Sequence, residues 1–327
     1  MDGIMERMLA DQLGERKRKL EQALSAARDA DEITALLRDI DVALEKYSRG
    51  RYGLCESCGE PIEAERLMAD PLVRYCIEHL NAAEQKALER DIDLAAQIQN
   101  ALLPKRDMPL PGWEFAYYYR AAGTVSGDYL DLIIPDSAAG SFYFMTGDVT
   151  GKGIAASMLM SQLHGSVRTL SHSGLPVHRL VEQANRLFCE GSLSSHFATL
   201  VLGSAYDSGR LEICNAGHCS PMLIRGRKVD TISSTGLPLG VICNSPYTAV
   251  SHQLQKGDYV VMYTDGLTEA RNGSGEQFGE DRLVDLLRAR EFVAGDEIIS
   301  TCVAELAAFT GHGKFMDDLA ILALKKK

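Results

Sequence analysis

Aspartates at the ends of apolar, strand-like runs constrain the fold of this chain more than any other feature of its sequence. Asp148 and Asp265 each follow such a run, and Asp317 and Asp318 precede another. An ionised carboxylate beside a core is costly unless it is paired or bound to a cation, so several at separate strand ends suggest one shared cation site. Oxygen ligands in that number favour Mg²⁺ or Mn²⁺. The four stretches that carry acids of this kind are residues 126–131, 146–153, 263–266 and 315–318.

From residue 113 onward, short apolar runs alternate with longer amphipathic segments. Several runs are joined by short turns that contain glycine, and two helices separate the third run from the fourth. This order predicts antiparallel sheets with helices packed outside them. We expect helices at 153–171, 176–190, 279–290 and 295–310, and strands at 113–119, 129–134, 141–147, 197–206, 210–215, 221–225, 247–254, 258–263 and 318–324.

The first hundred or so residues are expected to be mostly helical. Residues 4–47 contain no proline, and the acidic segment 29–31 breaks their pattern, so we expect two helices folded back as an antiparallel hairpin. A connecting helix is expected over 81–103, ended by Pro104. Its apolar stripe could pair with a second copy of the same helix, so a homodimer through 81–104 is one hypothesis for the assembly. The stripe consists of Leu88, Ile92, Ala95, Ile98 and Leu102.

Composition and charge exclude several classes of protein. The 327 residues carry a formal net charge of -11, so the basic excess of a typical nucleic-acid-binding protein is absent. No run approaches the roughly 18 apolar residues that cross a membrane, and no signal peptide is recognisable at the start. We therefore expect a cytoplasmic protein that binds neither membranes nor nucleic acid.

Two pairs of metal-ligand residues stand between the hairpin and the connecting helix. Cys55 and Cys58 form the first pair, and Cys76 and His79 form the second, each with two residues between its members. This spacing places four ligands on two tight turns, as a tetrahedral Zn²⁺ requires. Four protein ligands leave no open position, so one structural zinc ion is expected.

The context of these ligands resembles the DksA/TraR-type zinc finger over about residues 30–80. The resemblance rests on residues 52–62, on the segment 66–71 and on Cys76. The family usually has cysteine where this chain has His79, and histidine is an acceptable zinc ligand. The acidic motif of family members that modulate RNA polymerase is missing from the hairpin turn, which argues against that role.

Five further cysteines are scattered singly among apolar residues. In a cytoplasmic chain they are expected to be small buried hydrophobic residues without catalytic function. They are Cys189, Cys214, Cys219, Cys243 and Cys302.

The aspartate stretches and the motifs between them resemble the metal-dependent protein phosphatases of type 2C, specifically their SpoIIE/RsbU-type branch, from about residue 94 to 324. The resemblance implies an α+β fold, an α-β-β-α sandwich, with two or three Mn²⁺ or Mg²⁺ ions. The expected domains are a helical hairpin (1–48), a zinc finger (49–80), a connecting helix (81–104) and a phosphatase domain (105–327). The matching motifs are residues 96–104, 126–131, 215–218, 236–240, 263–270 and 317–318.

The resemblance also implies roles for individual acids. Asp148 would bridge two metal ions, with the Val149 carbonyl assisting through water. Asp265 and Asp317 would complete the metal ligands, and Asp128 would hold metal-bound water or a third ion. For the remaining two acids we weigh a role in orienting ligands against a simple turn or cap role. These two are Asp131 and Asp318.

The implied reaction is hydrolysis of a phosphoserine or phosphothreonine by a metal-bridging hydroxide. The implied substrate is a phosphorylated anti-sigma-factor antagonist of the STAS type, with the zinc-finger module regulatory. His218 as an acid and Lys152 as a phosphate contact are weighed against purely structural roles. The alternatives are a non-catalytic zinc-finger regulator or transcription cofactor that binds phosphoprotein, and a phosphohydrolase of nucleotides or small molecules.

Overall fold

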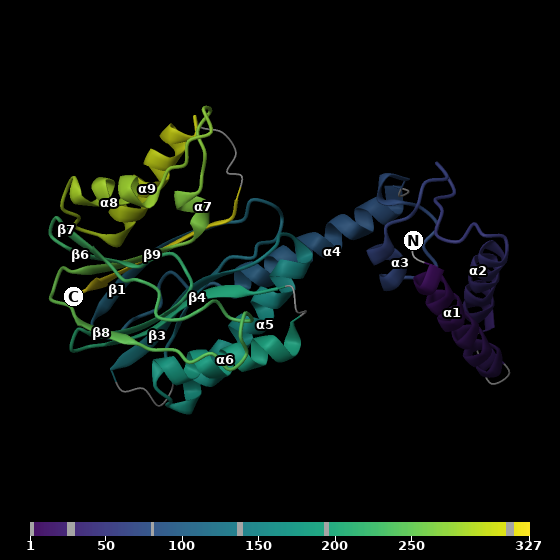
Figure 1. Cartoon of the computed structure of the whole chain (residues 1–327), viewed down its shortest axis with the longest axis horizontal. Coiled ribbons are helices and arrows are strands. Elements are labelled where there is room, and N and C mark those ends of the chain that lie inside the picture. The colour runs from purple at the N-terminus through teal and green to yellow at the C-terminus, as the bar shows by residue number, and fades with distance from the viewer. Residues whose placement is uncertain (1–2, 25–29, 80–81, 136–139, 193–195, 312–316) are drawn as a thin grey trace. The chain divides into compact units, whose positions relative to one another are not determined.

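The structure is a computed structural model that describes residues 3–24, 30–79, 82–135, 140–192, 196–311 and 317–327 (Figure 1). It divides into two compact units, Met1–Arg90 and Asp91–Lys327. Among the described helices, none is long and apolar enough to cross a membrane.

The smaller unit is built on a pair of helices and a short metal-ligand module. Helices α1 (Gly3–Leu24) and α2 (Ala30–Ser48) lie side by side, as expected for the hairpin (Figure 1). A short helix α3 (Ala64–Ala69) and a 3₁₀ turn η1 (Ile77–His79) follow. One apolar cluster holds the described part of this unit together, and its buried members are Leu9, Leu13, Ile40, Ala43, Tyr52, Cys55, Ile62, Leu67 and Cys76.

A polar contact fastens the module to α2. Arg74 donates two hydrogen bonds to the carboxylate of Glu56, at 2.6 and 2.7 Å, and Lys46 of α2 pairs with the same carboxylate. The hydrogen bond from Arg74 is the main cause that lowers the pKa of Glu56 to about 2. The carboxylate therefore stays ionised and bound to both cations throughout the physiological pH range.

The larger unit contains two antiparallel sheets of five strands each, in the orders β1-β10-β9-β6-β7 and β2-β3-β4-β5-β8. A buried apolar cluster that includes Trp113, Phe142 and Leu322 draws on strands of both sheets. The strands are β1 (Trp113–Arg120), β2 (Tyr129–Ile133), β3 (Ser141–Val149), β4 (Ala198–Tyr206), β5 (Arg210–Ala216), β6 (Met222–Arg225), β7 (Lys228–Thr231), β8 (Val250–Gln253), β9 (Tyr259–Tyr263) and β10 (Leu319–Lys326).

Helices cover the outer faces of both sheets. Helices α5 and α6 pack on the sheet that contains β3 and β4, and α8 and α9 pack on the sheet that contains β1 and β10 (Figure 1). The expected α-β-β-α sandwich is therefore confirmed. The helices are α4 (Ala82–Ala101), α5 (Ile154–Leu170), α6 (Val177–Gly191), α7 (Asp265–Thr268), α8 (Glu280–Arg288) and α9 (Gly295–Phe309), with a 3₁₀ turn η2 (Ser171–Ser173).

The expectation for two of the scattered cysteines is wrong. Cys189 and Cys243 form a disulfide across a sequence separation of 54 residues, and Cys243 is exposed. The reason lies in the tertiary fold, because Asn185 of α6 donates hydrogen bonds to the carbonyls of Ile242 and Cys243 and holds that loop against the helix. Two of the others, Cys214 and Cys302, are buried as expected.

Candidate active site and metal centres

Three of the aspartates meet at one edge of the sandwich. Carboxylate oxygens of Asp128, Asp148 and Asp265 all lie within 4.8 Å of one another. Asp128 immediately precedes β2, Asp148 ends β3 with its neighbour Val149, and Asp265 follows β9 as the first residue of α7. Two sheets thus bring together acids that are 137 positions apart in the chain.

Burial and mutual repulsion make this cluster costly without a cation. Burial, followed by the charge of Asp265, raises the pKa of Asp148 to about 7. Burial raises the pKa of Asp128 well above its usual value, and the charge of Asp148 adds to it. Burial and the nearby Asp317 raise the pKa of Asp265 as well. A divalent cation would remove this penalty, so the oxygen-only donor set fits Mg²⁺ or Mn²⁺.

Thr264 and Gly127 place the first of these acids. The Thr264 hydroxyl donates a hydrogen bond of 2.6 Å to the Asp128 carboxylate and accepts one of 2.9 Å from the backbone of Ala320. A Cβ at residue 127 would lie 2.8 Å from the Val149 carbonyl oxygen and 3.1 Å from the Asp148 carboxylate. Only glycine allows the loop to approach β3 this closely, which explains the Gly-Asp sequence at 127–128.

Asp318 lies next to this loop and holds its backbone. Its two carboxylate oxygens accept hydrogen bonds from the backbone N–H groups of Ala122, at 2.7 Å, and Gly127, at 2.9 Å. A Cβ at Gly266 would come within 1.9 Å of the Asp318 carbonyl, so the Asp-Gly pair at 265–266 permits this contact. Asp318 therefore orients the loop that carries Asp128 and does not itself join the three-acid cluster.

Asp317 is directed to a lysine. Its carboxylate lies 2.9 Å from the Nζ of Lys152, in the loop between Asp148 and α5. This hydrogen bond raises the pKa of Lys152, so the side chain remains cationic. Asp317 also contributes to the raised pKa of Asp148 and of Asp265, which places its charge close to the cluster.

Asp131 lies apart from the cluster. Its buried carboxylate is 3.0 Å from Nε2 of His164 and accepts a hydrogen bond of 2.5 Å from Arg168, both on α5. Residues three apart around a strand point to opposite faces, so Asp128 and Asp131 diverge although one motif contains both. The contacts of Asp131 attach α5 to β2.

His218 is buried and uncharged. Burial lowers its pKa to about 4, and its Nδ1 is 2.8 Å from the hydroxyl of Thr199. The Thr199 hydroxyl also lies 3.4 Å from the Asp148 carbonyl oxygen. Asn215 accepts a hydrogen bond from the backbone of His218 and donates one to its carbonyl. These contacts favour a structural role over proton donation at neutral pH.

Sequence reasoning missed two residues that shape the site, Thr264 and Gln99. Both stand inside the motifs at 263–270 and 96–104, and these motifs by themselves do not indicate a contact with the loop before β2. Gln99 is buried on α4 and forms two hydrogen bonds with the backbone of Ser126. A polar residue in an otherwise helical apolar pattern was the available signal.

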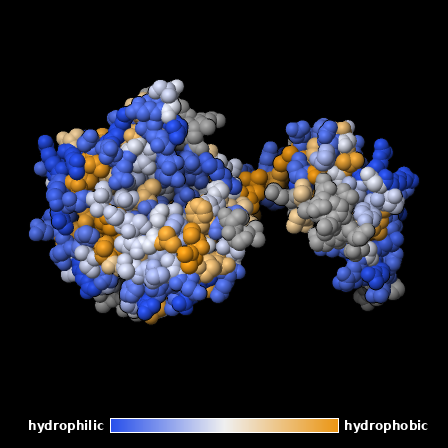
Figure 2. All heavy atoms as spheres, viewed as in Figure 1, coloured by the Kyte–Doolittle hydropathy of each residue, from blue (hydrophilic) through white to orange (hydrophobic). Residues whose placement is uncertain are grey.

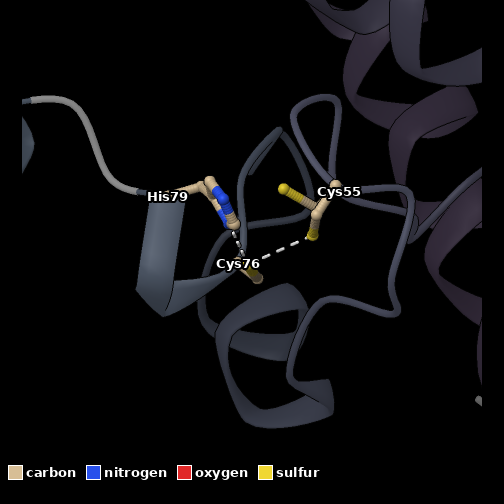
Figure 3. Close-up of side chains that lie close together, drawn as sticks. Cys55, Cys76 and His79 are labelled. Carbon is tan, nitrogen blue, oxygen red and sulfur yellow. Dashed lines mark hydrogen bonds between the residues drawn. The ribbon is translucent and has the colours of Figure 1, made fainter.

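The four ligands expected for zinc also meet. One ligand atom from each of Cys55, Cys58, Cys76 and His79 lies within 4.8 Å of the others. Figure 3 shows Cys76 and His79 pointing toward one another, and their Sγ and Nδ1 atoms are 3.2 Å apart. The first pair stands on a tight turn in which the backbone of Gly59 donates to the carbonyl of Cys55.

The Cys55 and Cys76 thiols differ in pKa. Although burial opposes it, hydrogen bonds from backbone N–H groups lower the pKa of Cys55 to about 6. Burial raises the pKa of Cys76 to about 11, with the Cys55 sulfur adding to it. Thiolates are the zinc-binding form, and three sulfurs with one imidazole are a donor set that suits Zn²⁺.

Two family models match the chain. The model described as Stage II sporulation protein E (SpoIIE) covers residues 138–327. The prokaryotic dksA/traR C4-type zinc finger covers residues 50–78. His79, the fourth ligand here, is the residue directly after that match.

Individual relatives agree with both the family and the fold. Protein IcfG of Synechocystis is 28% identical over 72% of this chain, which spans 41% of the length of IcfG. Phosphoserine phosphatase RsbU of Bacillus subtilis is 25% identical, with 74% of this chain and 72% of RsbU covered. The SiaA-PP2C domain of Pseudomonas aeruginosa superposes with a TM-score of 0.66 at 21% identity, covering 76% of this chain and all of that domain, which shows a PP2C fold.

Proposed function

The chain belongs to the SpoIIE family, and from this premise we propose that it is a metal-dependent serine/threonine phosphoprotein phosphatase. One observation carries the proposal: Asp128, Asp148 and Asp265 converge within 4.8 Å in a partly buried site where their charges repel. Such an arrangement is stabilised when divalent cations bind there.

Each residue would have a defined task. Asp148, at the end of β3, would contact two cations, and Asp265 and Asp128 would hold them from the other strand ends. Two bound Mn²⁺ or Mg²⁺ ions supply an activated water nucleophile and neutralise charge on the phosphoryl oxygens. Lys152 is cationic and sits beside Asp317, where it would orient the phosphate as it arrives. Asp317 would join the ligands once that ion pair opens.

A phosphoprotein is the proposed substrate. RsbU, which is similar over most of this chain, is named a phosphoserine phosphatase. Large apolar side chains are exposed directly after the aspartate loop, at Ile154 and Met158 of α5. Figure 2 shows apolar patches that interrupt the hydrophilic surface of the larger unit. Such surface suits a folded protein better than a nucleotide. We propose a STAS-type anti-sigma-factor antagonist as its class.

The decisive test compares wild type with Asp148→Asn in phosphate release from a phosphoserine protein with Mn²⁺. We expect a loss of about 10³-fold or more, because charge stabilisation of the transferred phosphoryl group is removed. Asp281→Asn, an exposed acid on α8, is the matched control and should retain full activity. Equal turnover by Asp148→Asn, or none by wild type, would favour the non-catalytic regulator. Faster release from nucleotides than from phosphoprotein would favour a small-molecule phosphohydrolase.

We further propose that α4 pairs with its counterpart in a second copy of the chain. Leu94 and Ile98, one helical turn apart on α4, are 54% and 57% exposed. Burying these two side chains is favourable, and a parallel or antiparallel helix pair would do so. Sedimentation should report a dimer for wild type and a monomer for Leu94→Glu/Ile98→Glu. A monomeric wild type at micromolar concentration would contradict this assembly.

A further inference from the structure

Gln99 bridges helix α4 and the loop that carries Asp128. Its side-chain amide donates a hydrogen bond of 2.6 Å to the Ser126 carbonyl, and its side-chain oxygen accepts one of 2.9 Å from the Ser126 N–H. The side chain is only 6% exposed, and Ser126 is fully buried. Glutamine suits this position because one carboxamide both donates and accepts.

The contact continues from Ser126 to the carboxylate cluster. The Ser126 hydroxyl accepts a hydrogen bond of 3.0 Å from the backbone N–H of Asp128. The Asp128 carboxylate is in turn held by Thr264. Gln99 is therefore connected to Asp128, an acid of the cluster, through hydrogen bonds with a single intervening residue, Ser126.

The cluster needs such a restraint. Three carboxylates within 4.8 Å repel one another, and the simplest relief is for the loop before β2 to swing Asp128 away. Asp318, which follows this loop in the chain, fixes it at Ala122 and Gly127. Gln99, which precedes the loop, fixes it at Ser126. A ligand held in place before the cation arrives binds it more tightly, since less ordering remains to be done.

We propose that Gln99 is a positioning residue that holds Asp128 in the cluster and thereby sets the affinity for the divalent cation. This role rests on the proposed function only in that the cluster binds a divalent cation. It assigns to α4 a defined effect on the site, through one side chain.

The test is calorimetric titration of Mn²⁺ into the full chain with zinc retained, for wild type, Gln99→Leu and Gln97→Leu. Gln97 is an exposed glutamine on the same helix, so its variant controls for the substitution itself. We expect the Mn²⁺ dissociation constant of Gln99→Leu to rise about tenfold, because two buried hydrogen bonds are lost. Gln97→Leu should stay within twofold of wild type.

Two further measurements separate positioning from a general loss of stability. At saturating Mn²⁺ the kcat of Gln99→Leu should return to near the wild-type value, which a merely structural defect would not allow. Ser126→Ala removes the next hydrogen bond in the chain of contacts, so its Mn²⁺ dissociation constant should rise about threefold. This variant tests the same role if Gln99→Leu does not fold.

The outcomes are distinct. Wild-type Mn²⁺ binding with an unchanged dissociation constant in Gln99→Leu and Ser126→Ala overturns the role of Gln99 and leaves the phosphatase proposal standing. Absence of Mn²⁺ binding by wild type overturns the cation site and the role of Gln99 together.

Discussion

The two candidate metal centres of this chain are assembled in opposite ways. The four candidate zinc ligands come from residues 55–79, on two neighbouring turns. The three clustered aspartates instead lie as far apart in the chain as Asp128 and Asp265, and two sheets bring them together. The first centre is part of the core of the smaller unit, since Cys55 and Cys76 are themselves members of its apolar cluster. The second centre lies on a fold that large apolar clusters hold together without it.

This contrast indicates in which of the two units folding depends on metal binding. In the smaller unit, folding and metal binding should be one event, because two of the four candidate ligands are part of its buried apolar cluster. The larger unit should stay folded without cations, although repulsion between the acids lowers its free energy of unfolding.

Loss of zinc should unfold the metal-ligand module of the smaller unit and leave the larger unit folded. Cys76→Ser removes a thiolate ligand that also belongs to the apolar cluster, and zinc contributes about 10 kcal/mol or more to such folds. Hydrogen exchange should show loss of protection over 50–79 and unchanged protection in β3 and β9. Ser57→Ala, in the same turn, is the control. Retained protection over 50–79 would contradict the coupling of folding to zinc binding in this unit.

The two centres should respond to pH with opposite sign. The pKa of Asp148 is about 7 in the folded protein against 3.8 as its ordinary value, so the folded state binds more protons in that window. The free energy of unfolding of the metal-free larger unit therefore falls as pH rises from about 4 to 7, by at most about 4 kcal/mol. The zinc module instead loses its metal as pH falls, because its ligands must be deprotonated.

Denaturant unfolding of metal-free protein at pH 5 and pH 8 measures the first effect. Mn²⁺ at pH 8 should restore stability, and Asp148→Asn should flatten the pH dependence. Equal stability of the metal-free larger unit at both pH values would contradict the cost assigned to the aspartate cluster.

The disulfide should matter to the larger unit alone. Removing it with Cys189→Ser/Cys243→Ser should lower the free energy of unfolding by roughly 2–4 kcal/mol, because the unfolded chain gains freedom. Calorimetry without reductant would show the shift, with Cys219→Ser as the control. Two free thiols at these positions in native protein would remove the basis of this prediction.

The smallest effect on stability is expected at Lys152. Its side chain is 65% exposed, so its ion pair with Asp317 should contribute no more than about 1 kcal/mol. Lys152→Met should therefore leave the melting temperature unchanged but raise KM for phosphoprotein about threefold or more, if the lysine orients phosphate. An unchanged KM would assign the lysine to the turn alone.

Much of the fold was predictable from the sequence. The main strands and the four helices that cover the sheets follow from periodicity, and their ends lie close to the expected ones. Strand β7 and helix α7 were not expected, since each has only four residues and too short a pattern to recognise.

The sequence predicted the kind of ligand in the candidate site better than it predicted which aspartates lie there. Asp131 and Asp128 stand in one motif, yet Asp131 faces α5 and binds His164 and Arg168. Asp317 and Asp318 are adjacent, yet one pairs with Lys152 and the other accepts from the backbone at residues 122 and 127. Neighbours in a strand or turn point in different directions, so a shared motif does not imply a shared ligand sphere.

Local spacing and periodicity were enough to predict the four candidate zinc ligands, the oxygen donors of the second candidate site and the layered fold. The tertiary structure alone decided which carboxylates meet, that Cys189 and Cys243 are bonded, and that Gln99 reaches Ser126. These contacts join distant segments, and their geometry is set by sheet register and helix packing, which no local pattern records.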